Sequence, residues 1–458
     1  MTDLLVRGAA GILTGLPAPE ERRSGDIRIR QGRIVEIGSL VPAPGEAVVD
    51  ASGCAIYPGL INTHHHLFQT MLKGVPAGID LPLEGWLAEV PYRYRPFIDE
   101  DALETAALVG IAELILSGVT TIADHHYLAT SDPAFDSEAV IMEAASRFGV
   151  RMVLCRGGAT RSRTDLAKPM PVESLEDMIA RLEDLTVRYH DPAPDAMRRV
   201  VFAPTLLTWS VAPEHLRAIA QAARYLGLRR HSHLSETQGD GRYCATVSTL
   251  RPVAWIGEHD WLGPDVWFAH LVHVDDDEVR LLAETGTGMA HCPQSNCRLG
   301  SGVAPADKLA ALGGRVSLGV DGSASNESSG MIDEMHCAWY VHRAAKGAGA
   351  VRAEEVLRWA TAGGADILGL PAVGTIEVGK AADLAIFELD LLRYAGLHDA
   401  LLGPIVGGVA RARHVFVGGR PIVVDGEIPN LDLQALSTRA AGVVRRLAAA
   451  VADERVPA

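Results

Sequence analysis

The middle of the chain alternates short apolar runs with longer segments of helical pattern. Residues 101–118 and 213–227 are two clear examples of the helical segments. The apolar runs between such segments have the length of strands, and nearly all of them end in polar or ionisable residues. Eight runs have this character: residues 56–65, 119–126, 151–158, 199–206, 228–234, 266–272, 287–294 and 315–322. Repeated βα units of this kind predict an α/β fold, a distorted (β/α)8 TIM barrel with its site at the carboxyl ends of the strands.

The two ends of the chain follow a different pattern. Short β-like runs with turn residues between them occupy residues 4–13, 26–38 and 47–58, and similar runs return only at residues 382–390 and 412–428. Gly418 and Gly419 form a predicted hairpin turn within the last run. We therefore expect residues 1–57 and 372–430 to build one small β-sandwich domain beside a catalytic barrel of residues 58–371. Residues 431–458 are expected to form a helix packed on the outside.

Composition narrows the class of protein. Of the 458 residues, 48% are hydrophobic and 22% are charged, which is typical of a globular protein. The formal net charge of −15, with no run of Lys and Arg to offset it, disfavours nucleic acid and anionic membranes as partners. Without a signal-like amino terminus or a run of about 18 apolar residues, the chain is expected in the cytoplasm. The six scattered cysteines lack a CxxC pair, so we expect buried thiols.

The first candidate for chemistry is the sequence NTHHH at the end of the first barrel strand. His64 and His66 stand two residues apart, so the strand period of two points both imidazoles to the same face while His65 faces away. Two neighbouring imidazole nitrogens favour zinc or a similar divalent ion. Because the histidines lie within a long apolar strand, we interpret them as metal ligands and not as a solvated histidine run.

Three later strand ends carry residues that fit the same site. His233 follows an apolar strand and is the expected third ligand, whereas His231 lies deeper and is interpreted as a core histidine. Asp321 follows the last strand and precedes small residues, which makes its carboxylate the fourth ligand candidate. His270 ends another strand and is expected to hydrogen-bond the metal-bound water. Glu236 lies three residues after His233, where that strand gives way to a loop.

These residue types predict a hydrolytic reaction. Three neutral imidazoles and one carboxylate around zinc leave an open position for water, whose pKa falls from about 16 to about 7. Hydrolysis of an aromatic C–NH₂ bond also needs a proton on the ring nitrogen and another on the departing ammonia, and a carboxylic acid that binds no metal can shuttle both. We assign this task to Glu236 and expect a small heterocycle and water as the substrates.

The segments PGLINTHHH, HLSET, FAH and GVDGSASN together resemble the amidohydrolase superfamily, in its branch of cytosine, guanine and 8-oxoguanine deaminases. The resemblance covers essentially the whole chain. It implies His64, His66, His233 and Asp321 as ligands, with catalytic roles for Asp321, for Glu236 as proton shuttle and for His270 beside the hydroxide. Relatives with two metals carry a modified lysine at the end of the fourth strand, which here reads VVFAPTLLTW. We therefore expect a single Zn²⁺, with Fe²⁺ as the alternative.

Within this branch, THHHLFQ, MLKGVPAG, RGGATRSR and HCPQSNCRL look most like the isoxanthopterin deaminases, which implies isoxanthopterin or pterin 6-carboxylate as substrate. Such rings present a lactam and an aminopyrimidine edge, so an amide and a guanidinium would suit them. Gln69 and Arg156 are the expected contacts, although Arg156 also suits a structural salt bridge. Trp86 and Tyr127 are candidates to stack on or border the ring.

Other assignments stay open at this point. The alternatives are an 8-oxoguanine or guanine deaminase, an s-triazine hydrolase that removes chloride or alkylamines, and a non-catalytic binding protein on the same barrel. The last is disfavoured because an unused set of buried histidines and carboxylates is costly to keep desolvated. His125, His126 and His291 also lie near strand ends, where we expect them to support the ligands or line the pocket. We further expect a homo-oligomer.

Overall fold

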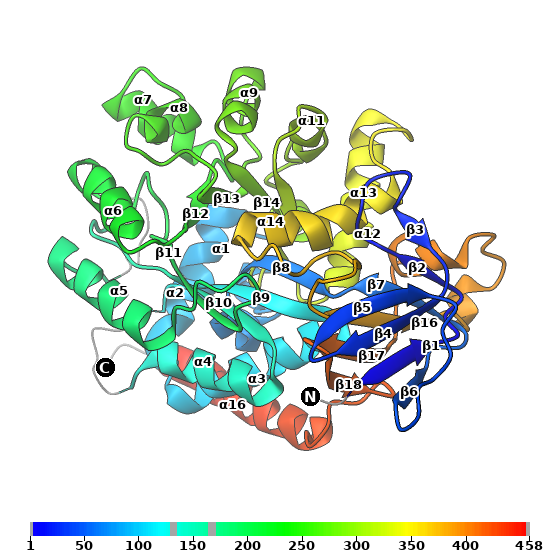
Figure 1. Ribbon diagram of the computed structural model, residues 1–458. Helices are drawn as coiled ribbons and strands as arrows, with labels where there is room; N and C mark the ends of the chain where they lie inside the picture. Colours follow the sequence, from blue (N-terminus) through cyan, green and yellow to red (C-terminus); the bar gives the residue numbers. More distant parts are fainter. Residues whose placement is uncertain (1–2, 129–134, 164–170, 455–458) are drawn as a thin grey trace.

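The centre of the computed structural model is a parallel sheet of eight strands that is nearly closed into a barrel (Figure 1). The structure describes residues 3–128, 135–163 and 171–454. The parallel strands follow one another in chain order and correspond to the eight predicted runs. They are β8 (Leu60–His65), β9 (Val119–His126), β10 (Arg151–Arg156), β11 (Arg198–Phe202), β12 (Arg230–Leu234), β13 (Val266–His270), β14 (Gly288–His291) and β15 (Val316–Leu318).

The barrel closes where its last strand meets its first. A parallel bridge joins His65 to Asp321, and the Asp321 amide donates to the carbonyl oxygen of His64 at 3.0 Å. This closure brings the ends of β8 and β15 together, although more than 250 residues separate them in the chain. The predicted (β/α)8 fold is confirmed.

Helices cover the outside of the barrel, and most of them come in the chain after one barrel strand and before the next. In α5, the buried residues Met178, Leu182 and Leu185 recur at helical spacing, and the Ser174 side chain caps the first turn. The larger helices are α3 (Glu100–Leu116), α4 (Ser137–Phe148), α5 (Leu175–Tyr189), α6 (Pro213–Tyr225), α7 (Gly239–Val247), α9 (Asp276–Thr285) and α12 (Met331–Lys346). Shorter helices are α1 (Leu83–Glu89), α2 (Pro91–Tyr94), α8 (Pro252–Gly257), α10 (Pro293–Arg298), α11 (Ala306–Ala311), α13 (Ala353–Arg358), α14 (Gly364–Leu368) and α15 (Gly403–Val406).

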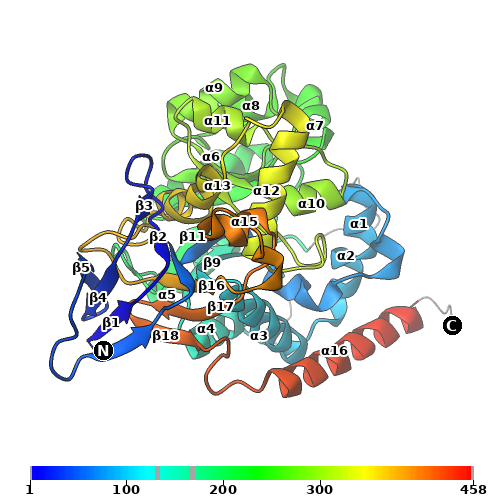
Figure 2. The ribbon, with the colours of Figure 1, turned by 90° about the vertical axis from the view of Figure 1, so that its right-hand side faces the viewer.

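Two further sheets lie side by side in Figure 2; the first is built from the N-terminal end alone and the second from both chain ends. Ile27 and Ile29 from the first sheet pack with Ile56, Ile386 and Phe416 from the second in one buried cluster. The first sheet has the order β5-β4-β1-β6, with β5 (Arg33–Gly38), β4 (Asp26–Arg30), β1 (Leu4–Arg7) and β6 (Ala47–Asp50). The second has the order β18-β17-β16-β7-β2-β3, with β18 (Arg420–Val424), β17 (Ala412–Val417), β16 (Leu384–Glu388), β7 (Cys54–Pro58), β2 (Gly11–Leu13) and β3 (Arg22–Arg23).

The sandwich therefore joins segments from opposite ends of the chain, because β16 pairs antiparallel with β7 and β7 pairs with β2. Strands β17 and β18 form the expected hairpin. Its turn uses Gly418 and Gly419 at φ 52° and 71°, a conformation that glycine adopts without strain. The exact domain boundaries stay a prediction.

The final helix, α16 (Leu433–Glu454), lies along the outside of the molecule against α3 (Figure 2). It buries Leu436, Val443, Leu447 and Val451, which share one helical face. Arg439 also reaches Asp101 of α3 at 2.7 Å. Residues 455–458 of the predicted segment lie outside the described residues.

Two further expectations concern cysteines and membranes. All six cysteines are free, and four are buried, but Cys297 is exposed and Cys337 is partly exposed. The expectation of six buried thiols is therefore wrong for Cys297, which lies on the exposed face of the short helix α10 and not in a strand. None of the helices in the described part of the chain has the length and apolar character needed to cross a bilayer.

Candidate metal and active site

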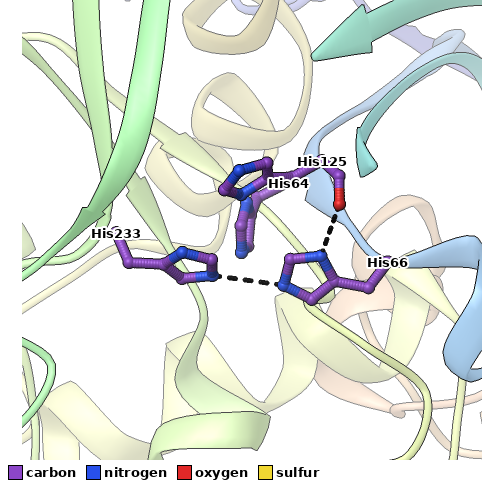
Figure 3. A group of neighbouring side chains, drawn as sticks. All are labelled: His64, His66, His125 and His233. Carbon is purple, nitrogen blue, oxygen red and sulfur yellow. Dashed lines mark hydrogen bonds between the residues drawn. The ribbon is translucent and has the colours of Figure 1, made fainter. Parts of the chain in front are cut away.

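The four predicted metal ligands converge at the carboxyl ends of the barrel strands. Asp321 Oδ1 lies 3.3 Å from Nε2 of His64 and 3.2 Å from Nε2 of His66. The Nε2 atoms of His66 and His233 are 3.2 Å apart, and Figure 3 shows the three imidazoles turned toward one another. His65 points elsewhere, toward the Ser329 hydroxyl. The strand period of two thus places His64 and His66 on the same side, as the NTHHH pattern indicates.

Backbone carbonyls orient two of these imidazoles. His66 Nδ1 donates to the carbonyl oxygen of His125 at 2.7 Å, as drawn in Figure 3, and His233 Nδ1 donates to that of Thr205 at 2.6 Å. A carbonyl oxygen can only accept a hydrogen bond, so the proton of each ring lies on Nδ1. The lone pair on Nε2 is therefore directed to the cluster, which is the orientation a metal ligand requires.

His64 is oriented through a second histidine. His231 Nδ1 donates to the Trp267 carbonyl oxygen at 3.0 Å, which leaves the His231 Nε2 as an acceptor. That atom lies 2.8 Å from Nδ1 of His64, which donates to it and keeps its own Nε2 free for the cluster. The interpretation of His231 as a core histidine is consistent with this arrangement. His231 supports the site through its contact with His64.

Burial sets the charge of the imidazoles. It lowers the pKa of His64 and His233 well below the ordinary value, because an apolar interior disfavours the imidazolium ion. Both rings are thus neutral near pH 7, the form that binds metals. Among the described residues, the Nε2 atom of His64 has no hydrogen-bond partner in its buried position. Three imidazoles and one carboxylate match the donor set that zinc prefers.

Asp321 is held in place by its second oxygen. Its Oδ2 accepts hydrogen bonds from Ser295 at 2.6 Å and Ser325 at 3.2 Å, and Oδ1 remains directed at the histidines. Two hydroxyl donors on Oδ2 favour the ionised form of the Asp321 carboxyl group. The side chain is therefore an ionised carboxylate.

Glu236 and His270 lie side by side next to the ligands. His270 Nε2 is 3.6 Å from Glu236 Oε2, and His270 Nδ1 donates to Asn296 Oδ1 at 3.0 Å. Burial raises the pKa of Glu236 well above its ordinary value, and the nearby Asp321 and Asp240 carboxylates add to this shift. A raised pKa favours the protonated form of Glu236, which suits a proton donor.

Two site residues have unusual backbone conformations. His270 has φ 73° and Asp321 has φ 61°, in the left-handed region that side chains with a Cβ rarely adopt. Each such residue costs about 1–3 kcal/mol, and such residues cluster at active sites. The strain is located where the chain turns sharply after β13 and β15 to present these side chains.

A cavity beside the cluster contains three of the four predicted substrate contacts: Gln69, Trp86 and Tyr127. Gln69 Nε2 lies 2.8 Å from the Tyr127 hydroxyl, whereas its Oε1 has no partner among the described residues. Gly322 leaves the space for this amide, because a Cβ there would lie 1.9 Å from Gln69 Oε1. The full lining is His66, Gln69, Trp86, Leu87, Tyr92, Tyr127, Arg163, Thr205, Leu206, His233 and Asp321.

Arg156 is not part of that lining. Its Nη1 and Nη2 atoms form a two-pronged salt bridge with Glu173, at 2.7 and 2.6 Å, so the geometry favours the structural alternative over substrate contact. Arg163, seven residues further along, lines the cavity instead with 8% of its surface exposed. Arg156 ends β10 and Arg163 lies in the loop that follows it, where no periodicity shows which side chain turns inward.

The remaining strand-end histidines support the barrel. His125 Nε2 donates to the Ala203 carbonyl oxygen at 2.7 Å, and a nitrogen of His125 lies within 4.8 Å of those of His64, His66 and His233. His126 contacts the Ser137 hydroxyl at 2.9 Å, and His291 contacts His342 at 3.2 Å. His273 Nε2 donates to the Ser301 carbonyl oxygen at 3.0 Å.

Comparison with known proteins identifies the family. Residues 55–422 match the model of the amidohydrolase family. The chain belongs to this family. It is 48% identical to an isoxanthopterin deaminase from an unknown prokaryotic organism, over 97% of both chains. It is 40% identical to the 8-oxoguanine deaminase of Pseudomonas aeruginosa, over 96% of this chain and 98% of that protein.

A solved relative shows the same architecture with a metal. The structure of atrazine chlorohydrolase from Arthrobacter aurescens TC1 complexed with zinc has a TM-score of 0.90 to this chain. The two are 28% identical, and the similarity covers 96% of this chain and all of that one. The resemblance to amidohydrolases and their deaminase branch is confirmed over almost the whole length.

Proposed function

We propose that this chain is a zinc-dependent hydrolytic deaminase of a lactam-containing amino heterocycle, with isoxanthopterin or pterin 6-carboxylate as substrate. The observation that carries this proposal is the position of the buried Glu236 carboxyl group beside His270 and the cluster of three imidazoles and Asp321. Family membership and the deaminase relatives support the same reaction class.

His64, His66, His233 and Asp321 would hold a single ion. Their donor atoms suit Zn²⁺, with Fe²⁺ as a second possibility for the same ligand types. When bound, zinc in such a site lowers the pKa of water to about 7 and so supplies a nucleophile at neutral pH. The solved atrazine chlorohydrolase holds zinc, which supports the choice of metal.

The proton transfers fall to Glu236 in this proposal. Its raised pKa keeps a proton available for the ring nitrogen, whose protonation makes the adjacent carbon more electrophilic. The carboxylate formed by this step can accept a proton from water and pass it to the departing amine. His270, whose Nδ1 is bound by Asn296, presents a neutral Nε2 that can accept a hydrogen bond from the attacking water.

Gln69 and Tyr127 suit a lactam. In their hydrogen bond, one group must donate and the other must accept, so the pair keeps at least one donor and one acceptor for a ligand. This remains true if the two ends of the amide are exchanged. A lactam presents a carbonyl oxygen and a neighbouring N–H, which complement such a pair. The indole N–H of Trp86 donates to the Ala324 carbonyl oxygen at 3.1 Å, which holds the buried side chain in place. The face of this indole can border the flat ring of the substrate.

The same lactam argument supports 8-oxoguanine as a second candidate, and the 40% identical relative carries that name. The deciding experiment measures ammonia release by the zinc-loaded enzyme from isoxanthopterin, pterin 6-carboxylate, 8-oxoguanine, guanine, cytosine and an aminotriazine, compared by kcat/KM. We expect the pterins to be preferred. Preference for 8-oxoguanine would favour the second candidate, and the absence of ammonia from every ring would overturn the assignment as a deaminase.

A further inference from the structure

A second cavity of about 290 Å³ adjoins the one beside the metal ligands; we call it the outer chamber. Arg163 and Leu206 line both cavities, so they form the junction between them. Glu236, the proposed proton shuttle, also lines the outer chamber. A ligand held against the metal ligands would therefore have a neighbouring space on the far side of this junction.

One wall of the outer chamber is apolar and held in place. It is formed by Leu206 and the indole of Trp209. The Trp209 ring lies 5.0 Å from that of Tyr243, centre to centre, and the Tyr243 hydroxyl accepts a hydrogen bond from Arg161 at 3.1 Å. These contacts hold the indole in position, so the wall is already formed without a ligand.

The outer chamber also has polar lining residues, with groups that both donate and accept. Glu84 Oε1 lies 3.6 Å from Arg242 Nη2, and the Thr237 hydroxyl donates to the same oxygen at 3.2 Å. The side chains of Glu84 and Arg242 are 40% and 65% exposed, so solvent still reaches both. Each can exchange water for a ligand hydroxyl, which donates to the carboxylate and accepts from the guanidinium.

The charges of the outer chamber argue against an anionic ligand. Its two guanidinium groups, Arg163 and Arg242, are opposed by three carboxyl groups, those of Glu84, Glu236 and Asp240. Even with Glu236 protonated, the positive charges do no more than balance the negative ones, so a carboxylate or phosphate gains little here. A lining that combines apolar surface with a donor and acceptor pair suits a neutral chain with C–H faces and hydroxyl groups.

We infer that the outer chamber binds a hydroxylated substituent of the substrate, so that the preferred ring carries a short polyol or sugar-like chain. This inference rests on the proposed function, because it assumes that the ring itself lies beside the metal ligands. Leu206 and Trp209 contact the carbon chain, and Glu84 and Arg242 contact its hydroxyl groups.

The test compares rings that differ only in this chain. Ammonia release is measured for pterin, for pterin with a trihydroxypropyl chain at carbon 6, and for pterin 6-carboxylate. The pair of 8-oxoguanine and its ribonucleoside repeats the comparison on a purine. We expect kcat/KM to be about tenfold higher for the hydroxylated member of at least one pair, in line with one hydrogen bond to a charged group.

Variants then locate the effect. Glu84→Gln and Trp209→Leu should each reduce about tenfold the ratio of kcat/KM for the hydroxylated compound to kcat/KM for the parent compound. The change should come mainly from KM. Glu89→Gln on the same helix α1 is the matched control and should keep the wild-type ratio, because Glu89 does not line the chamber and pairs with Arg93 at 2.7 Å. Thermal unfolding of every variant shows whether the fold is intact.

Each outcome has a separate meaning. If the parent rings release ammonia but the ratio is near one, or is unchanged in both chamber variants, the outer chamber is only a passage and the inference is wrong. A clear preference for pterin 6-carboxylate over the polyol would overturn the argument from charge. If no ring releases ammonia, the proposed function fails before the inference is reached.

Discussion

His231 is expected to control the affinity of the site for zinc, although it is not a ligand. Its Nε2 is the acceptor for Nδ1 of His64, and both rings are fully buried. In His231→Leu, the His64 Nδ1–H would lose its acceptor in a place that water does not reach. Alternatively, the His64 proton would move to Nε2 and block the lone pair that faces the cluster.

The size of the effect follows from the burial of this group. An unsatisfied buried donor costs about 1–3 kcal/mol, which corresponds to a factor of roughly 10–100 in zinc affinity. Loss of a residue that orients a metal ligand typically has an effect of the same size. His231→Gln provides the matched comparison, because an amide oxygen can take the place of the imidazole Nε2. Both variants lose the ring that stacks on Trp267 at 4.5 Å, so this loss cancels between them.

The assay is a competition for zinc between the metal-free protein and a chelator of known affinity. We expect His231→Gln to bind zinc within a few-fold of wild type and His231→Leu to bind it roughly 10–100-fold more weakly. Thermal unfolding of the metal-free proteins separates this effect from a loss of stability. Equal zinc affinity in the two variants would refute the reasoning, because the acceptor for His64 is what distinguishes them.

Three further predictions concern the site and one helix beside it. Glu236→Gln should keep its zinc but lose ammonia release by about 10²–10⁴-fold, since an amide cannot shuttle protons; full activity would exclude the shuttle role. Asp321→Ala should lose both zinc, measured by elemental analysis, and turnover. For Glu138 in α4, burial alone would raise the pKa, but His126 and Arg181 lower it from its ordinary value of 4.5 to about 2. Its carboxylate therefore stabilises the fold above pH 4.5, by roughly 3 kcal/mol, and this contribution is lost as the pH falls toward 2. Glu138→Gln should lower the free energy of unfolding at pH 7 but not near pH 2. An equal decrease at both pH values would contradict this pH dependence.

The sequence predicts residues well where a regular element determines the direction of a side chain. His64 and His66 lie at the end of a strand, so the period of two places them together, and the closure of the barrel brings Asp321 to them. The eight strands and the hairpin at Gly418 can also be predicted from the sequence, because apolar runs and glycine pairs are local signals.

Prediction fails where a contact depends on the path of a loop. Arg156 was expected to reach the substrate, but Glu173 comes within 2.6 Å of it from a segment 17 residues away, while Arg163 turns inward. The donor role of His64 toward His231 depends on a pairing across 167 residues, which no local pattern encodes. The exposure of Cys297 also has no local signal, because it depends on how the short helix α10 packs on the barrel.

The composite sandwich also has a consequence for synthesis of the chain. Strand β7 can pair with β16 only after about 330 further residues have been made. At roughly 5–20 residues per second, the nascent β7 waits for about 20–60 s with an unpaired edge, during which the barrel strands emerge and can assemble. An unpaired edge is prone to association with other chains, so the incomplete polypeptide is the vulnerable form. The last strands to leave the ribosome therefore complete the sheet that the first strands began.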